Sequence, residues 1–359
     1  MNNQKKSDGA GITQQCRQEK ENHYMQGPFA KSISTAEKSK KLLETVSPED
    51  TLAILIKADP DAIASALALK RLFWRKARKV DIVRIDKIER ADNLAFVRLL
   101  NLKPQHIRNF KISDVSKWAT VDSQPDHHDE FKKFRFDIII DHHPATDLPE
   151  TPFIDIQEDY GSNSTILTEY LKSSGIKPSP RLATALFYGI KTDTDNFVRG
   201  SATNDIKAFR HLYEYANLNI IKKIESSEIT KKTLSSFKTA LDKLTVRHQT
   251  AFVHMGDVGN ADTLVMVADF FMKMAEATWS IVSGISDRKL IVIFRNAGFR
   301  RDAGKLASKM FGQVGSAGGH KSMARAEIPL EQIGHIAKKA TDIEAYVKSE
   351  IKKSRQDLV

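Results

Sequence analysis

The chain has 359 residues, 41% of them hydrophobic and 28% charged, a balance that excludes a largely disordered protein. No stretch approaches the ~18 uninterrupted apolar residues that cross a bilayer, so the sequence excludes an integral membrane protein. The formal net charge of +11 favours a polyanionic ligand, although a lysine-rich surface on an ordinary globular protein gives the same charge.

Residues 1–45 are polar and are predicted as a flexible tail that ends in a short helix over residues 36–46. The single cysteine, Cys16, lies in this tail and excludes both an internal disulfide and a metal site with several thiolate ligands. The first 30 residues contain no apolar stretch of the kind found in a secretory signal, so we expect a cytoplasmic protein.

Residues 46–200 alternate between strand and helix patterns. Continuous apolar runs predict strands at 51–57, 80–85, 118–122, 136–141 and 152–156, and the segments between and after them predict helices at 61–77, 91–101, 163–174 and 181–190. Apolar strands separated by helices are typical of a buried parallel sheet. These residues are therefore predicted to form a doubly wound, mostly parallel α/β domain.

Residues 201–247 are predicted as a helical connector, because helix-forming segments follow one another there without a strand. A mixed pattern returns over residues 248–350. It predicts strands at 249–255, 279–285 and 289–295 and helices at 263–277, 303–312 and 331–351. We expect a second, smaller α/β domain in this region.

Acidic residues and histidines follow the ends of several predicted elements of the first domain. In chain order they are Asp59, Asp61, Asp122, Asp141, His142, His143 and Asp193. Ligands of open α/β sheets bind beyond the carboxyl ends of the strands, so we expect these side chains to meet at one edge. Clustered carboxylates oppose folding unless a cation neutralises them, and oxygen and imidazole ligands suit Mn²⁺, Mg²⁺ or Fe²⁺.

Each of these residues also has a structural explanation when it is taken alone. An aspartate after a strand commonly caps a helix, and Asp61 could cap the helix that follows it. A pair of histidines is a common surface feature. A second run of the same letters, Asp126-His127-His128, follows a polar turn and is assigned to a loop. The prediction of a metal site therefore depends on the joint occurrence of all these residues in this order.

Four segments resemble, in order, the four motifs of the DHH phosphoesterase superfamily, which includes RecJ exonucleases, oligoribonuclease/pAp phosphatases, exopolyphosphatases and family II pyrophosphatases. They are Asp59-Pro-Asp61-Ala-Ile-Ala-Ser65, Asp122, Asp141-His-His143 and Gly189-Ile-Lys-Thr-Asp193. Gly315-Ser-Ala-Gly318-Gly319-His320 is similar to the glycine-rich signature of the DHH-associated C-terminal domain. Arg295 matches that domain's substrate-facing arginine. The resemblance covers residues 50–345 and is specific for the superfamily but not for a substrate.

The resemblance implies a two-metal hydrolase. It implies that Asp122 bridges two metals, that Asp61, His142 and Asp193 complete one site, and that Asp59 belongs to the other. It further implies that Asp141 fixes a histidine ring and that His143 faces the substrate. In the C-terminal domain, backbone N–H groups at Gly318 and Gly319 would approach a phosphate, while His320 and Arg295 would hold the rest of the substrate. A plain tight turn explains Gly318-Gly319 equally well.

One position departs from the superfamily pattern. A metal-ligating histidine stands four residues before Asp59 in the superfamily, where this chain has Leu55, which cannot bind a metal. We hypothesise that the Lys57 ammonium takes part of that metal's space, pairs with Asp59 and Asp122, and helps to bind substrate. The alternative is that Lys57 points to solvent and the first site is only weakened. The expected cofactor is Mn²⁺ or Mg²⁺, with one tight site and a weakened second site.

The predicted function is metal-dependent hydrolysis of phosphodiester or phosphoanhydride bonds in a cleft between the two domains. Small nucleotides are the expected substrates: short oligonucleotides, pAp or cyclic dinucleotides. An exopolyphosphatase is an alternative of the same class. The alternative of another class, favoured by Leu55, is a degenerate module that binds a nucleotide or polyanion without turnover. The expected partner is a phosphate-containing small molecule or short single-stranded nucleic acid, and a homodimer is left open.

Two further features have competing explanations. The segment Gly161–Thr165 resembles one that lines the superfamily's active site, and it fits an ordinary capped helix N-terminus equally well. Trp74 and Trp279 are predicted to pack in a core or between domains rather than to stack on bases.

Overall fold

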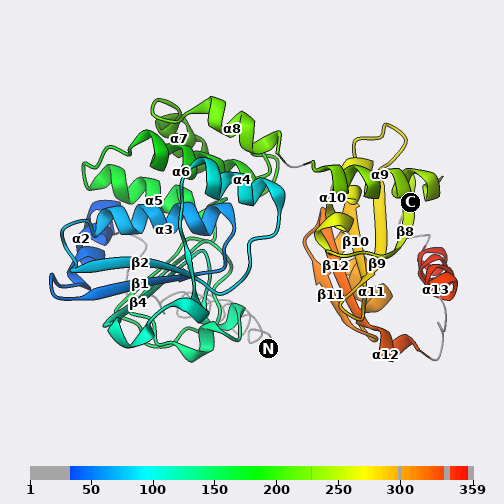
Figure 1. Cartoon of the computed structure of the whole chain (residues 1–359), viewed down its shortest axis with the longest axis horizontal. Helices are drawn as coiled ribbons and strands as arrows, with labels where there is room; N and C mark the ends of the chain where they lie inside the picture. Colours follow the sequence, from blue (N-terminus) through cyan, green and yellow to red (C-terminus); the bar gives the residue numbers. More distant parts are fainter. Residues whose placement is uncertain (1–32, 228, 298–300, 335–339, 355–359) are drawn as a thin grey trace, which may run out of the picture. The chain divides into compact units, whose positions relative to one another are not determined.

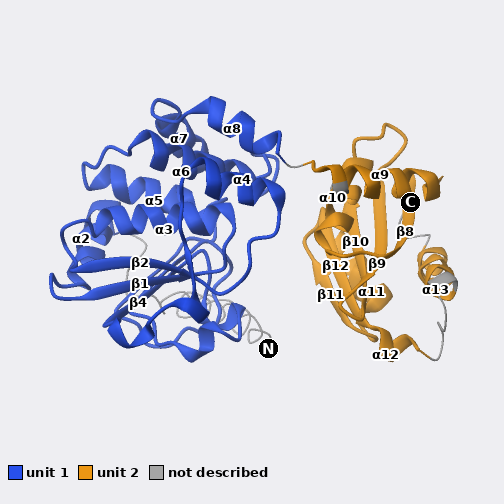
Figure 2. Cartoon of the chain, in the orientation of Figure 1, with its two compact units in different colours: residues 1–228 blue, residues 229–359 orange. Residues whose placement is uncertain are grey.

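The computed structural model describes residues 33–227, 229–297, 301–334 and 340–354 (Figure 1). The chain divides into two compact units, residues 1–228 and residues 229–359 (Figure 2). Cys16 and residues 1–32 of the predicted tail lie outside the described residues. No helix within the described ranges has both the length and the hydrophobicity needed to cross a bilayer.

The first unit is built on a six-stranded sheet in which every neighbouring pair of strands is parallel. The strands are β1 (Thr51–Ile56), β2 (Lys79–Arg84), β3 (Gln105–His106), β4 (Lys117–Val121), β5 (Ile138–Asp141) and β6 (Phe153–Ile156), in the order β3-β2-β1-β4-β5-β6. The strand order reverses between β1 and β4. The carboxyl ends of these two strands therefore flank the crevice in which such sheets bind their ligands.

Helices cover one face of this sheet. They are α2 (Thr35–Glu44), α3 (Pro60–Leu72), α4 (Ala91–Leu99), α5 (Asn163–Ser173), α6 (Pro180–Asp193), α7 (Thr203–Tyr213) and α8 (Leu218–Glu225). Successive residues of β1 alternate between the two faces. Leu52, Ile54 and Ile56 pack in the large core beneath the helices. All six residues of β1 are buried, which explains the continuous apolar run in the sequence.

The opposite face of the sheet is covered by irregular chain. Ala53 and Leu55 of β1 pack there against Phe131 and Phe136, within a segment whose helical turns are only three residues long. The predicted parallel α/β fold is confirmed. Among the described residues, however, this second face lacks the long helices that a doubly wound sheet usually has.

The second unit contains a six-stranded mixed sheet. Its strands are β7 (Thr245–Arg247), β8 (Thr250–Asp257), β9 (Trp279–Ser286), β10 (Lys289–Asn296), β11 (Ser316–Gly319) and β12 (Met323–Pro329), in the order β11-β12-β10-β9-β8-β7. Only β8 and β9 pair in parallel. Its helices are α9 (Lys231–Lys243), α10 (Asp262–Phe271), α11 (Ala303–Phe311), α12 (Leu330–Ile333) and α13 (Ala340–Lys353).

Three strands of this sheet were absent from the sequence prediction. β7 is an edge strand of three exposed residues, and β11 is rich in glycine, so neither has the apolar pattern of a strand. β12 does alternate, with Ala324, Ala326 and Ile328 buried. The predicted helix over residues 331–351 consists of α12 and α13, and residues 335–339 lie outside the described part of the chain.

The helices of residues 201–247 are shared between the two units. α7 and α8 belong to the first unit, and α9 belongs to the second. The two tryptophans also differ in their environment. Trp279 is 2% exposed in the core of the second unit, as predicted, whereas Trp74 is 60% exposed and takes no part in the core of the first.

Candidate metal centre

Four of the predicted metal ligands meet beyond the carboxyl ends of β1, β4 and β5. Asp61 follows β1, Asp122 follows β4, His142 follows β5, and Asp193 is the last residue of α6. One ligand atom from each of these four residues lies within 4.8 Å of the others. The chain separates Asp61 from Asp193 by more than a hundred residues, so the sheet topology brings them together.

His142 lies at the middle of this cluster. Its Nε2 is 3.2 Å from Asp122 Oδ1 and 3.0 Å from Asp193 Oδ2. On the other side of the ring, Nδ1 lies 3.0 Å from the Tyr160 carbonyl, which can only accept a hydrogen bond. The proton of a neutral ring is therefore fixed on Nδ1, and the Nε2 lone pair faces the carboxylates, as in a histidine that binds a metal.

The carboxylates give His142 an unusual affinity for a second proton. Burial lowers its pKa, but the facing Asp122 and Asp193 outweigh burial and raise the pKa to about 12. Without a metal, the protein thus neutralises part of the cluster with an imidazolium. A divalent cation would take over that role.

Asp61 is held at the N-terminus of α5. Its side chain is 2% exposed, and its two carboxylate oxygens accept hydrogen bonds from the backbone N–H groups of Asn163 (2.7 Å) and Ser164 (2.8 Å). Burial, and then the charge of Asp193, raises its pKa to about 7. The segment Gly161–Thr165 thus belongs to the site and also begins a helix.

Asp59, and not Asp61, caps α3. Asp59 Oδ1 accepts a hydrogen bond from the Ala62 N–H (2.8 Å). Among the described residues a second group could also share one ion, Asp122, Asp141, His142 and His143, and Asp59 is missing from both groups. Its predicted role as a metal ligand therefore stays a prediction.

When the His142 ring is neutral, two buried atoms of the cluster have no hydrogen-bond partner among the described residues. They are Asp122 Oδ1 and His142 Nε2, and the neighbouring Ser164 Oγ is a third. Burial and the charges of Asp59 and Asp61 raise the pKa of Asp122 well above its usual value. Each such atom costs about 1–3 kcal/mol when it is left unsatisfied. One cation between them would satisfy the oxygen and the nitrogen, and this donor set suits Mn²⁺ or Mg²⁺.

Asp141 holds the second histidine of the motif. Its side chain is fully buried, and Oδ1 lies 2.9 Å from His143 Nδ1. Burial raises the pKa of Asp141, but hydrogen bonds from His143 and Gln124 outweigh it and hold the pKa below its usual value. Asp141 therefore remains an acceptor, and the half-exposed His143 ring presents Nε2 away from it.

Gln124 was not identified from the sequence. Its amide is fully buried; Nε2 donates to Asp141 Oδ2 (2.8 Å), while Oε1 accepts from the N–H (2.8 Å) and the hydroxyl (2.9 Å) of Thr146. The nearby His127 ring packs edge-on against His143, with centroids 5.6 Å apart. The second run Asp126-His127-His128 was assigned to a loop; Asp126 and His127 lie in a three-residue 3-10 turn that supports the site. The sequence feature that could have pointed to Gln124 is its position, two residues after the predicted ligand Asp122.

Leu55 occupies the position at which the superfamily has a metal-ligating histidine. It is fully buried in the apolar cluster on the face of the sheet away from the helices. Lys57 is exposed, and among the described residues it makes no ion pair with Asp59 or Asp122. The hypothesised ion pair is therefore absent from the structure, and a role of Lys57 in binding substrate stays a prediction.

Residues 52–190, which contain most of this cluster, match the sequence profile of the DHH family, N-terminal domain. Over these residues, the chain resembles the DHH family. An uncharacterized protein of Methanocaldococcus jannaschii is 35% identical over 276 residues, which are 77% of this chain and 57% of that protein. An A-adding tRNA nucleotidyltransferase of Geobacter sulfurreducens is 30% identical over 250 residues, 64% of this chain and 27% of the enzyme. The chain thus spans about half, or less, of the length of these relatives.

The chain also has a related fold among solved structures. An exopolyphosphatase-related protein from Bacteroides fragilis covers 92% of this chain, and this chain covers 99% of it, with a TM-score of 0.68 and 15% identity. At this identity the similarity shows a shared fold that extends over both units, and it does not show a shared substrate.

The residues predicted to bind substrate in the second unit lie apart from the metal cluster in the sequence and have structural contacts of their own. Gly318 and Gly319 are in β11, and a Cβ at Gly319 would lie 2.4 Å from the Met323 carbonyl oxygen, so only glycine fits against β12. Arg295 Nε donates to Asp269 (2.6 Å). His320 is exposed. The roles of these residues in binding substrate remain predictions.

Proposed function

We propose that this protein is a divalent-metal-dependent phosphoesterase that hydrolyses phosphodiester or phosphoanhydride bonds of small nucleotide substrates. The observation that carries the proposal is the group Asp61, Asp122, His142 and Asp193, arranged around two buried atoms that one divalent cation would satisfy together. A cluster without a catalytic or binding role would have no reason to keep this destabilising charge.

In this proposal, Asp61, Asp122, His142 and Asp193 hold the metal. The Tyr160 carbonyl holds the Nδ1 proton of His142, so Nε2 is the nitrogen that would face the metal, and the N-terminus of α5 orients Asp61. When bound, a divalent cation would supply Lewis acidity toward a phosphoryl oxygen. Mn²⁺ or Mg²⁺ is the proposed ion, because oxygen atoms make up most of the ligand set.

His143 is the proposed proton donor. Its Nδ1 hydrogen bond to Asp141 directs Nε2 outward, where a protonated ring can donate to the oxygen of the departing group. Gln124 and Asp141 hold this ring in place. Because His143 is only half-buried, a phosphate ester can reach it from solvent.

Three observations bear on the substrate and on the competing function. The net charge of +11 favours an anionic substrate, and the fold is shared with a protein described as exopolyphosphatase-related, so polyphosphate is the alternative substrate. Leu55 favours the competing function, a module that binds nucleotides or polyanions without turnover, because it removes one superfamily ligand.

The test compares four substrates with Mn²⁺: bis-p-nitrophenyl phosphate, a dinucleotide, pAp and polyphosphate. The decisive variant is Asp122→Asn. Its matched control is Asp126→Asn, which is the same substitution at an exposed aspartate of the second Asp-His-His sequence. Turnover that Asp122→Asn abolishes and Asp126→Asn retains supports the enzyme. Tight binding without turnover supports the module, and turnover in Asp122→Asn refutes the proposed site.

A further inference from the structure

Positive charge is concentrated near the amino ends of the first unit's strands, whereas the metal centre lies at their carboxyl ends. α3 runs antiparallel to β1, so its C-terminal end at Leu72 lies near the amino ends of the strands. The chain then turns and enters β2. We call residues 71–79 the basic turn, because five exposed cations stand there: Arg71, Arg75, Lys76, Arg78 and Lys79.

Most cations of the basic turn have no acidic partner. Among the ion pairs of the described residues, Lys79 pairs with Asp81 (2.7 Å), but none involves Arg71, Arg75 or Lys76. The dipole of α3 explains a cation in its last turn, such as Arg71, but this effect does not extend beyond the helix. Arg75 also has a φ of +62°, a conformation that glycine or asparagine adopts at lower cost.

Trp74 stands in the middle of the basic turn and is 60% exposed. Tryptophan is buried on average far more than this. The neighbouring Phe73 is fully buried and anchors the turn, and the N–H of Lys76 donates to its carbonyl (2.9 Å). The fold thus holds an indole on the surface among cations. This combination is typical of proteins that bind single strands, whose bases stack on aromatic rings while phosphates contact Lys and Arg.

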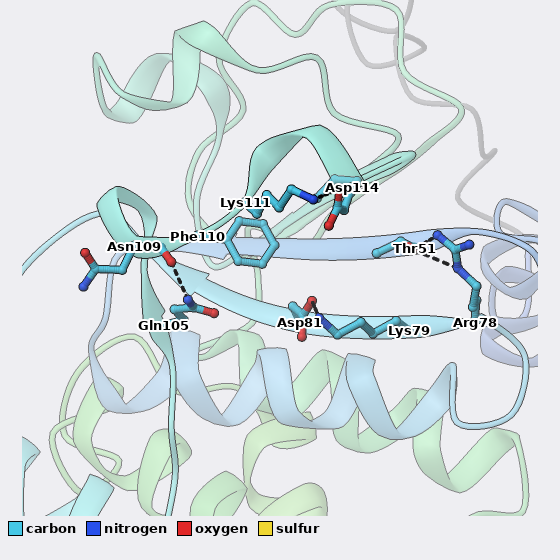
Figure 3. Close-up of a pocket in the computed structure, with 10 residues that line it drawn as sticks. Thr51, Arg78, Lys79, Asp81, Gln105, Asn109, Phe110, Lys111 and Asp114 are labelled. Atoms are coloured by element: carbon cyan, nitrogen blue, oxygen red, sulfur yellow. Dashed lines mark hydrogen bonds and ion pairs between the residues drawn. The ribbon is translucent and has the colours of Figure 1, made fainter.

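A polar pocket continues from the basic turn across the sheet. It has a volume of about 510 Å³ and lies between β1 and β2 and the segment 105–115 (Figure 3). This volume is within the ~300–1,000 Å³ usual for small-molecule sites. Arg78 and Lys79 belong to both features. Arg78 Nη2 donates to Thr51 Oγ1 (2.8 Å), which fixes the guanidinium at the pocket wall.

The far wall of the pocket adds a second aromatic ring. The Phe110 side chain lies above the strands, and Lys111 comes from the same segment (Figure 3). The two acidic residues of the pocket are each matched by a cation, Asp81 by Lys79 (2.7 Å) and Asp114 by Lys111 (3.0 Å). Arg78 therefore leaves the pocket lining with a net positive charge.

We propose that the basic turn and this pocket bind single-stranded nucleic acid. Trp74 and Phe110 stack on bases, and Arg75, Lys76 and Arg78 contact the phosphates. This binding goes beyond hydrolysis at the metal centre. It needs no metal, because the surface lies near the amino ends of the strands and the metal centre lies at their carboxyl ends. An anionic membrane would also attract the basic turn, but its lipid headgroups have no base that could stack on the aromatic ring of the pocket. We therefore favour nucleic acid.

The experiment measures the fluorescence anisotropy of labelled oligo(dT) and oligo(rU) of about ten nucleotides, in EDTA. We expect the full chain to bind one or both strands with an affinity that falls steeply with salt. Trp74→Ala should weaken binding about tenfold, and Trp74→Phe should restore most of it. Neither variant should change turnover of bis-p-nitrophenyl phosphate, which reports on the metal centre alone.

Charge reversal provides the matched comparison. Arg75→Glu with Lys76→Glu should reduce the salt slope by about 0.7 for each lost phosphate contact. Lys222→Glu with Lys223→Glu, on exposed positions of α8, changes the net charge equally and should leave binding nearly intact. Equal weakening by both pairs, no binding by the wild type at low salt, or binding to anionic vesicles but not to oligonucleotides would each overturn the proposal.

Discussion

Gly189 of α6 lies directly against the carboxylate of Asp61. A Cβ atom at position 189 would lie 3.0 Å from Asp61 Oδ1 and 2.5 Å from Ser164 Oγ. Glycine therefore lets α6 approach the cluster closely. Asp193 stands four residues further along α6, on the same face of the helix, so the glycine and the acidic ligand of this motif act together.

Gly189→Ala should weaken metal binding. The added methyl group would clash with the Ser164 hydroxyl and press against the Asp61 carboxylate, and a shift of Asp61 or of α6 to relieve these contacts would separate Asp61 from Asp193. We expect at least a tenfold loss of Mn²⁺ affinity by titration calorimetry, since altered support of metal ligands costs about 10–100-fold. Gly175→Ala is the control, because the structure leaves the space around position 175 open. Its positive φ gives it a stability cost of its own, so the comparison is made on metal affinity. Unchanged affinity in Gly189→Ala would contradict this role.

Gln124→Glu should separate the support of His143 from metal binding. The change keeps the acceptor for Thr146 but replaces the N–H donor to Asp141 with a second carboxylate. Two carboxylates in contact raise their pKa values and disturb the His143 ring. We expect a lower kcat and a shifted pH–rate profile, with a smaller change in Mn²⁺ affinity. Gln313→Glu, at an exposed position, is the control. A loss of metal affinity as large as the loss in kcat would contradict the assignment.

The residues of the metal cluster could be predicted from the sequence, whereas the environments of Gln124 and Trp74 could not. Asp61, Asp122, His142 and Asp193 could be identified because each follows a recognisable strand or helix, and parallel topology brings such ends together. Gln124 could not, because its importance depends on contacts with Asp141 and Thr146, which are distant from it in the sequence. The prediction that Trp74 packs in a core was wrong, because hydrophobicity predicts burial only on average, whereas the turn after α3 holds this ring outside the core.

Metal binding should weaken as the pH falls. The pKa of Asp61 is raised to about 7 in the folded protein, so below that pH a proton competes with the metal for this carboxylate. We expect proton release on binding at about pH 6, seen as a dependence of the calorimetric heat on the buffer's ionisation enthalpy. Equal Mn²⁺ affinity at about pH 5.5 and about pH 8 would contradict it. Asp126→Asn should show the same pH dependence as the wild type.

The same pKa shifts predict how metal removal affects stability. Asp61 has a folded pKa above its ordinary value of 3.8, and His142 has one above its ordinary value of 6.5. The folded, metal-free protein therefore holds protons that the unfolded chain loses, and its stability falls as the pH rises from about 4 to beyond 7. In EDTA, the melting temperature should be lower at about pH 8 than at about pH 6. Mn²⁺ should raise it more at the higher pH. A melting temperature in EDTA that rises over this interval would contradict the prediction.

Leu55→His should not restore a second tight metal site. Leu55 packs against apolar side chains that include Val83, Phe131 and Ile139, on the face of the sheet away from the helices. An imidazole there would lose these contacts and leave its nitrogens without partners, at a cost of about 1–3 kcal/mol for each unsatisfied group. We expect a lower melting temperature and no additional tightly bound Mn²⁺ by elemental analysis. Leu55→Met, which conserves volume, should cost less than about 1.5 kcal/mol and is the control for packing. A second equivalent of tightly bound Mn²⁺ in Leu55→His would mean that the strand can turn this position toward the metal centre, and that the loss of one histidine alone separates this chain from a two-metal enzyme.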